Sequence, residues 1–144
     1  MNSNSITHFV LNNWYLFLAL VVIVYLLLAE PVRRLMYGIQ SIPPSQAVQL
    51  INHHAAVIVD VRDPKEFQSG HIRKALNFPL SDLSKQASEL EKFKDKSIVL
   101  YCGTGQRSAQ AATFLRRQGF GSVHNLAGGI SRWRTENLPV TLET

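Results

Sequence analysis

An uncharged apolar run near the amino terminus constrains this chain most, because its surface must be removed from water. Residues 14–29 carry no charge and no strongly polar group, and the longer stretch 9–29 is interrupted only by Asn12 and Asn13. At about 1.5 Å per residue such a stretch reaches roughly 31 Å, the thickness of the hydrocarbon core of a bilayer. A core helix of a small domain would show a polar face, and this run shows none. The sequence therefore predicts one transmembrane helix over residues 9–30.

The flanks of this run bear on its orientation. A cleaved signal peptide begins with a basic region, whereas residues 1–29 contain no Lys or Arg. Arg33 and Arg34 follow the run, and the positive-inside rule then places everything after them in the cytoplasm. We expect a single-pass protein of the cell inner membrane, in contact with the lipid bilayer, with its carboxy-terminal domain cytoplasmic.

The remaining sequence has room for one ordinary domain. Pro43 and Pro44 interrupt the chain, so we expect a tail over 1–8, a linker over 31–41, a domain over 42–140 and a tail over 141–144.

The chain has one cysteine, which excludes an internal disulfide. Its net charge of +5 is modest and no dense basic stripe with interleaved aromatic residues is present, which argues against nucleic acid as a partner.

Segments typical of strands and of helices alternate through this domain. The expected strands are 55–61, 75–78, 97–101 and 122–126, and the expected helices are 45–52, 63–70, 81–93, 108–118 and a last one that follows Gly128 and Gly129 and carries Trp133. This alternation predicts an α/β fold with a mainly parallel central sheet and helices on both faces. Such sheets bind ligands at the carboxyl ends of their strands.

One strand, 97–101, ends in a loop that suits a nucleophile. Cys102 follows the strand, Gly103 and Gly105 allow a tight turn that presents backbone N–H groups, and Arg107 opens a helix. The N–H groups, the helix amino terminus and the guanidinium would each stabilise a thiolate. An inert buried cysteine at a strand end is the alternative interpretation.

The chain resembles rhodanese domains over residues 42 to about 140. The matching pieces occur in the family's order, and they are Asp60-Val61-Arg62, Glu66-Phe67, Gly70-His71-Ile72, residues 75–79, the loop CGTGQRS from Cys102 to Ser108, and residues 126–129 with Trp133. The resemblance implies a rhodanese-type sulfurtransferase on a rhodanese-like fold, in which Cys102 takes sulfur from a small donor anion such as thiosulfate. The sulfur would be held as a persulfide and passed to a thiol or protein acceptor.

The same resemblance assigns roles to residues around the cysteine. The substrate-binding loop would comprise Gly103, Thr104, Gly105, Gln106, Arg107 and Ser108. Its N–H groups would stabilise the persulfide, and Arg107 would hold the anionic donor. Asp60, Arg62 and His71 would support neighbouring loops rather than react. The reaction implied needs no metal and no organic cofactor.

Three further features refine this interpretation. Four residues separate Cys102 from Arg107, whereas dual-specificity phosphatases on the same fold have five, so phosphatase activity is disfavoured. His53 and His54 are adjacent, a spacing that does not suit a metal site. Arg73-Lys74 replaces the small residue and glycine usual in the family, which could alter a turn or add positive charge near the site.

Two other functions fit the same sequence. The chain could be a non-catalytic interaction module whose rhodanese fold docks a membrane-protein partner. A persulfide carrier could instead receive its sulfur from a protein donor. The sequence leaves both open beside the sulfurtransferase.

Overall fold

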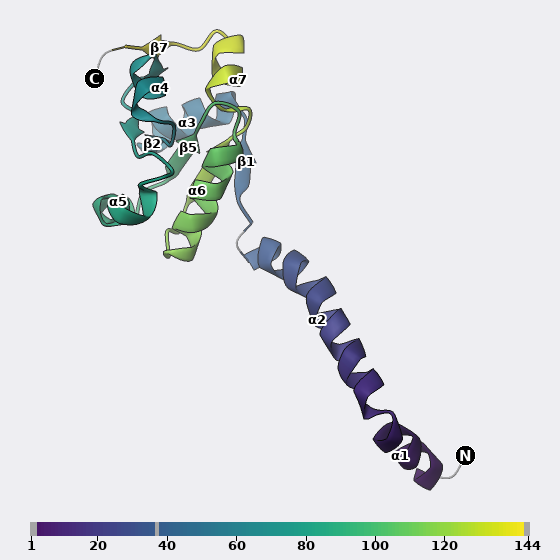
Figure 1. Cartoon of the computed structure of the whole chain (residues 1–144). Helices are drawn as coiled ribbons and strands as arrows, with labels where there is room; N and C mark the ends of the chain where they lie inside the picture. The colour runs from purple at the N-terminus through teal and green to yellow at the C-terminus, as the bar shows by residue number, and fades with distance from the viewer. Residues whose placement is uncertain (1–2, 37, 143–144) are drawn as a thin grey trace. The chain divides into compact units, whose positions relative to one another are not determined.

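The computed structural model describes residues 3–36 and 38–142, and for residues 3–5 and 30–36 it describes the backbone alone. Arg33 and Arg34, on which the expected orientation rests, therefore have side chains outside the description. The chain divides into two compact units, residues 1–38 and 39–144. The first unit is helical, and the strands of the described chain all belong to the second (Figure 1).

The amino-terminal unit consists of two helices, α1 (Ser3–Asn12) and α2 (Trp14–Met36), which are separated at Asn13. The side-chain amide of Asn13 donates a hydrogen bond to the carbonyl of Phe9 at 2.8 Å, and the backbone N–H of Asn13 donates to the same carbonyl at 3.1 Å, at the point where α1 ends. The expectation of one unbroken helix over residues 9–30 is therefore wrong.

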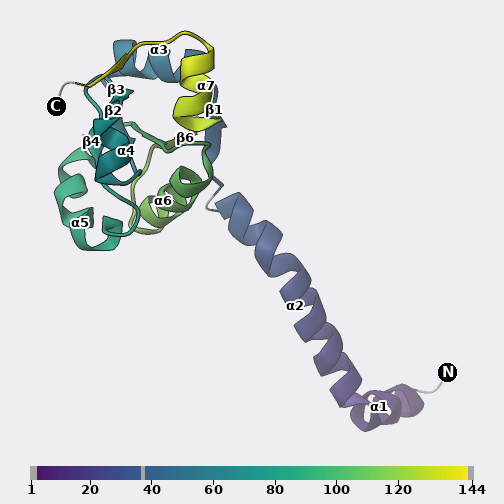
Figure 2. The same cartoon turned by 45° about the horizontal axis from the view of Figure 1, so that its top comes forward.

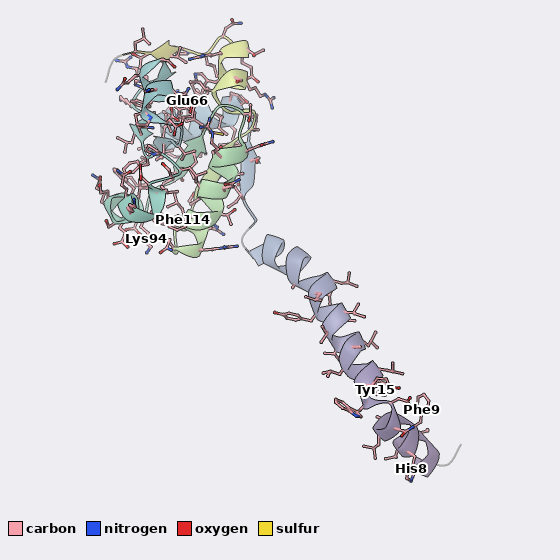
Figure 3. The ribbon with its side chains drawn as sticks, in the orientation of Figure 1. His8, Phe9, Tyr15, Glu66, Lys94 and Phe114 are labelled. Carbon is pink, nitrogen blue, oxygen red and sulfur yellow. The ribbon has the colours of Figure 1, made fainter. Side chains whose placement is uncertain are left out.

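The two helices differ from a simple transmembrane span. Within the described residues, no single helix combines the length and apolar character that a bilayer crossing needs. The segments Ile6–Asn12 and Trp14–Ala29 reach that length and composition only as a pair, and their axes are bent by 70°. Their apolar side chains project outward, as Phe9 and Tyr15 do, with exposed fractions of 61% and 55% (Figure 3).

The carboxy-terminal unit is built on a five-stranded sheet of order β1-β6-β5-β2-β4, in which every neighbouring pair is parallel. Its strands are β1 (Gln40–Ile42), β2 (Val57–Asp60), β4 (Leu76–Asn77), β5 (Ile98–Tyr101) and β6 (Val123–Leu126). A separate antiparallel pair joins β3 (His71–Ile72) to β7 (Val140–Thr141). β5 is the middle strand, so the residue that follows it lies at the centre of the carboxyl edge.

Helices cover both faces of this sheet (Figure 2). The helical elements are α3 (Pro44–His54), α4 (Pro64–Gln68), α5 (Leu83–Leu90), the 3-10 turn η1 (Glu91–Phe93), α6 (Gln106–Arg117) and α7 (Gly129–Thr135). Alternate residues of β5 point to opposite faces, so Leu100 belongs to the core cluster that includes Leu115 of α6, and Val99 to the one that includes Trp133 of α7. The predicted α/β architecture, with a mainly parallel sheet flanked by helices, is confirmed.

Three short strands extend this architecture beyond the predicted elements. β1 begins at Gln40, inside the segment assigned to the linker, and pairs with β6 along its whole length. β3 and β7 each have two residues, and β7 ends at Thr141 in the expected tail. Runs of two or three residues carry no readable periodicity, and these strands depend on partners far away in the sequence.

Candidate active site

Cys102 lies directly after β5, at the carboxyl edge of the sheet where ligands of α/β proteins bind. The loop after it ends at Gly105, which precedes the first residue of α6 and has φ +101°. Positive φ of this size is easily adopted only by glycine. The chain therefore turns sharply here, and the amino terminus of α6 is brought to the cysteine.

The thiol is enclosed by donors of this loop. The N–H of Gly105 donates to Cys102 Sγ at 3.1 Å, and the hydroxyl of Ser108 lies 3.4 Å from the same sulfur. Cys102 itself is only 1% exposed. The arrangement offers a sulfur anion hydrogen bonds that need no rearrangement of the backbone.

These contacts set the acidity of the thiol. Burial raises the pKa of Cys102, whereas the Ser108 hydroxyl and the N–H groups of Ser108, Gly105 and Thr104 lower it. The hydrogen bonds outweigh burial, and the pKa of Cys102 lies below its usual value. The thiolate, which is the nucleophilic form, is thereby favoured.

A buried hydrogen-bond network connects the Ser108 hydroxyl, which lies beside the sulfur, to neighbouring elements. Ser108 donates to Asn125 Oδ1 at 2.6 Å, and the Asn125 amide donates to the Gly105 carbonyl at 3.2 Å and to Ser41 Oγ at 3.3 Å. The Ser108 hydroxyl has one proton, so it serves either Asn125 or the sulfur at a given moment. Asn125 thus holds Ser108 in reach of Cys102. The sequence analysis missed it, although Asn125 lies near the end of β6 beside β5, where parallel strands bring their carboxyl ends together.

The Arg107 side chain is paired with the carboxylate of Glu66. Its guanidinium binds Glu66 of α4 with two hydrogen bonds, at 2.8 and 3.0 Å, and both side chains are about two-fifths exposed. The hydrogen bond with Arg107 lowers the pKa of Glu66 to about 2. Glu66 was not predicted as a site residue. Glu66-Phe67 is one of the pieces that carry the rhodanese resemblance, and the capping box of Glu66 with Asp63 indicates a helix start, but neither signal points to Arg107.

The amino terminus of α7 is hydrogen-bonded to the backbone of the cysteine loop. The N–H of Ile130 donates to the carbonyl of Cys102 at 2.8 Å, and the N–H of Ser131 donates to that of Gly103 at 3.2 Å. Gly129 has φ +58°, and a Cβ added there would lie 2.6 Å from the Gly103 carbonyl oxygen. The backbone of the cysteine loop is therefore fixed by a close approach that only glycine permits.

The rhodanese-like domain family matches residues 43–136, which is most of the unit that carries this loop. The chain belongs to the rhodanese-like family. An uncharacterised protein YibN of Escherichia coli strain K12 is 32% identical over 137 residues, covering 94% of this chain and 96% of that protein.

Other members of the rhodanese-like family resemble the domain alone. The thiosulfate sulfurtransferase GlpE of Pseudomonas syringae pv. syringae is 39% identical over 99 residues, covering 67% of this chain and 88% of its own. The crystal structure of a rhodanese-related protein from Thermoplasma volcanium superposes with a TM-score of 0.66 at 36% identity. It covers 72% of this chain and 99% of the other.

Asp60, Arg62 and His71, which were expected to support neighbouring loops, are buried in the rhodanese-like domain. Asp60 is fully buried and forms an ion pair with Arg62 at 2.7 Å, and Arg62 also donates to the Gly70 carbonyl at 2.8 Å. His71 is buried, stacks on Phe67 at a ring distance of 3.7 Å and bonds the Phe67 carbonyl. These contacts brace the segments around α4, from which Glu66 reaches Arg107.

The remaining expectations concern exposed residues. In the loop from Cys102 to Ser108, Thr104 and Gln106 are exposed and Gly103 is partly buried. Arg73 and Lys74 line a pocket with residues of α3 and α7, and none of the Cys102–Ser108 loop contributes to it. Within residues 3–36 and 38–142, no cluster of three or more His, Cys, Asp or Glu side chains could hold a metal ion, His53 and His54 included.

The lowered pKa of Cys102 predicts a distinctive alkylation profile for the rhodanese-like domain. Only the thiolate reacts, so the rate with iodoacetamide should fall as pH drops through the pKa, and its midpoint should lie below that of the urea-unfolded chain, about 8.5. Replacing Ser108 with alanine removes one stabilising hydrogen bond and should move the midpoint up. An unchanged midpoint in that variant would contradict the role given to Ser108.

Proposed function

We propose that this protein is a membrane-anchored sulfurtransferase that carries sulfur on Cys102 as a persulfide. The observation that carries the proposal is the environment of the Cys102 sulfur, where backbone N–H groups and the Ser108 hydroxyl stabilise an anion at the end of the central strand. The name of the related thiosulfate sulfurtransferase supports the same general reaction.

The reaction has two balanced steps. The Cys102 thiolate attacks the outer sulfur of a donor such as thiosulfate, a new S–S bond forms, the donor S–S bond breaks, and sulfite leaves with the bonding electron pair. A thiolate or cyanide acceptor then attacks the outer persulfide sulfur, and Cys102 regains its electron pair as thiolate. No net oxidation of the protein occurs. The loop N–H groups that stabilise the first anion, such as that of Gly105, lie close enough to stabilise the persulfide anion as well.

The Glu66–Arg107 pair favours a second candidate on the same chemistry. Glu66 already accepts one hydrogen bond from each terminal nitrogen of the guanidinium and offsets its charge, so a small anionic donor would share Arg107 with a carboxylate. A protein donor that delivers persulfide sulfur by docking needs no such anion contact. Slow turnover with thiosulfate and fast transfer from a persulfidated protein would identify the chain as a sulfur carrier.

The membrane part of the proposal rests on the apolar segment. The large apolar side chains described in α1 and α2, between Ile6 and Leu28, are exposed, from 39% for Val10 to 69% for Tyr25 and Leu27. Exposing so continuous an apolar surface to water is energetically unfavourable, whereas the hydrocarbon core of a bilayer would cover it. With Arg33 and Arg34 after the segment, we propose that the rhodanese-like domain faces the cytoplasm from the inner membrane.

Intact mass tests the sulfur chemistry directly. After incubation with thiosulfate, the full chain should gain about 32 Da, the mass of one sulfur atom, and lose it again with cyanide. Alkylating Cys102 with iodoacetamide beforehand blocks the single thiol and provides the matched control. If the wild-type chain gains no mass from thiosulfate or from a persulfidated protein donor, the proposed function fails.

Orientation is tested with one introduced thiol. Ser84 lies on the exposed side of α5, so Ser84→Cys in a Cys102→Ser background gives a single reactive cysteine in the rhodanese-like domain. A membrane-impermeant maleimide should label it in inverted inner-membrane vesicles and leave it unlabelled in intact spheroplasts. Labelling in intact spheroplasts would show the opposite orientation to the one proposed. Recovery of the chain in the soluble fraction would contradict the proposed membrane anchor.

A further inference from the structure

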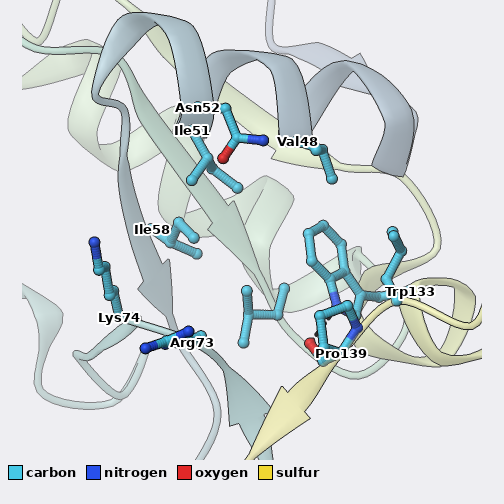
Figure 4. Close-up of a pocket in the computed structure, with 10 residues that line it drawn as sticks. Val48, Ile51, Asn52, Ile58, Arg73, Lys74, Trp133 and Pro139 are labelled. Atoms are coloured by element: carbon cyan, nitrogen blue, oxygen red, sulfur yellow. Dashed lines mark hydrogen bonds between the residues drawn. The ribbon is translucent and has the colours of Figure 1, made fainter.

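A pocket of about 400 Å³ opens on the face of the sheet covered by α3 and α7. Its walls are apolar and come from separate elements, with Val48 and Ile51 on α3, Ile58 on β2 and Trp133 on α7 (Figure 4). Cavities that bind small molecules have this volume and combine an apolar lining with a few polar groups. None of the residues from Cys102 to Ser108 lines it, so it is distinct from the cysteine site.

Two cations lie at one side of the pocket. Arg73 and Lys74 occupy the turn between β3 and β4, across the pocket from Trp133 and Pro139 (Figure 4). Within the described part of the chain neither side chain forms an ion pair or a hydrogen bond, and the pocket lining includes no carboxylate. The cations are therefore unneutralised, and an anion would complement them.

The backbone adds a second and independent observation. The N–H of Ala75 donates to the Ile72 carbonyl at 3.0 Å, which closes a turn with Lys74 at its third position. Lys74 has φ +65°, a conformation that glycine adopts easily and lysine does not. The turn thus holds a long cationic side chain at a conformational cost, beside an apolar pocket that contains no partner for it.

We propose that this pocket binds a small organic anion whose apolar body lies between α3 and Trp133 and whose carboxylate or phosphate head meets Arg73 and Lys74. The apolar lining supplies affinity for the body, and the two cations select a charged head over a neutral one. Because both cations are exposed, we expect a preference of about tenfold rather than absolute selectivity.

The probe is 2-naphthoate, compared with its neutral amide 2-naphthamide. The full chain in zwitterionic nanodiscs is observed by ¹H–¹⁵N NMR through the indole N–H of Trp133, which donates to the Pro139 carbonyl at 3.0 Å inside the pocket lining. The indole of Trp14, in the apolar segment, reports any partition of the probe into lipid. We expect 2-naphthoate to shift the Trp133 resonance, with an apparent Kd about tenfold below that of 2-naphthamide.

Variants separate this pocket from the cysteine site and from misfolding. In Arg73→Gln/Lys74→Gly the two probes should bind equally, and the turn tolerates the change because glycine suits its positive φ. Cys102→Ser should leave 2-naphthoate binding unchanged, so failure of the sulfur chemistry and failure of this pocket are distinguishable. Equal affinity of the wild type for both probes, no shift of the Trp133 resonance, or loss of binding in Cys102→Ser would each overturn the proposal.

Discussion

Replacing Cys102 with serine should abolish sulfur transfer from thiosulfate to cyanide, a loss of about three orders of magnitude or more. The serine hydroxyl is almost entirely protonated at neutral pH, so the hydrogen bonds that favour the thiolate have no anion to stabilise. The oxygen also cannot form the persulfide that links the two steps. Thiocyanate production, corrected for the uncatalysed reaction, measures the loss.

The loss should come from chemistry rather than from folding. Serine is close to cysteine in size and its oxygen can accept the N–H of Gly105, so the free energy of unfolding should change by about 1 kcal/mol or less. Ser108→Ala is the graded comparison, because it removes one hydrogen bond from the sulfur and leaves the nucleophile in place. Thiocyanate production retained by Cys102→Ser would contradict the nucleophile assignment. An inactive wild type would instead favour the non-catalytic interaction module.

The cysteine loop was readable from the sequence because its parts are local. An apolar strand, one thiol, two glycines and the start of a helix stand within a dozen residues. Their order alone places Cys102 at the carboxyl edge of the sheet, and strand–helix alternation supplies the rest of the architecture. What local order cannot give is the direction of a side chain, so the sequence did not show that the Arg107 guanidinium lies against Glu66.

The contacts that the sequence analysis missed join residues far apart in the chain. Glu66 meets Arg107 across 41 residues, and Asn125 meets Ser41 across 84. Neither pairing leaves a periodic pattern. Ser41 and Asn125 are opposed by the pairing of β1 with β6, and Glu66 and Arg107 lie on helices that follow the paired strands β2 and β5. The Asn13 break is the converse case. There the helix is interrupted at a residue whose side-chain amide and backbone N–H both donate to the Phe9 carbonyl, although hydropathy alone extends the helix through the segment.

The same reasoning explains why Gly128 and Gly129 were understood only in part. The sequence placed them before the last helix, and the structure adds that the first turn of α7 donates hydrogen bonds to the backbone of the cysteine loop. A glycine in a sequence does not reveal which backbone passes it. The coordinates do, and they connect a core helix to the position of the nucleophile.

Gly129→Ala should be the most disruptive single-methyl change in the domain. Alanine would have to adopt φ +58° and place its Cβ against the carbonyl oxygens of Cys102 and Gly103, the second at 2.6 Å. Neither oxygen belongs to a flexible side chain, so the loop or α7 must shift. Left-handed strain and overpacking together should lower the free energy of unfolding by about 3 kcal/mol. Urea unfolding in a neutral detergent measures it, through Trp133 fluorescence in a Trp14→Phe background.

A matched alanine substitution isolates the cause. Gly121 has no heavy atom within 4 Å of an added Cβ and does not occupy the positive-φ region, so Gly121→Ala adds the same methyl group without a collision. Its free energy of unfolding should stay within about 0.5 kcal/mol of the wild type. Sulfur transfer should fall in Gly129→Ala even at temperatures where the chain remains folded, because the carbonyls that would be displaced belong to the nucleophile and to the next residue. If both variants unfold alike, or if Gly129→Ala keeps full activity, α7 does not position the cysteine loop.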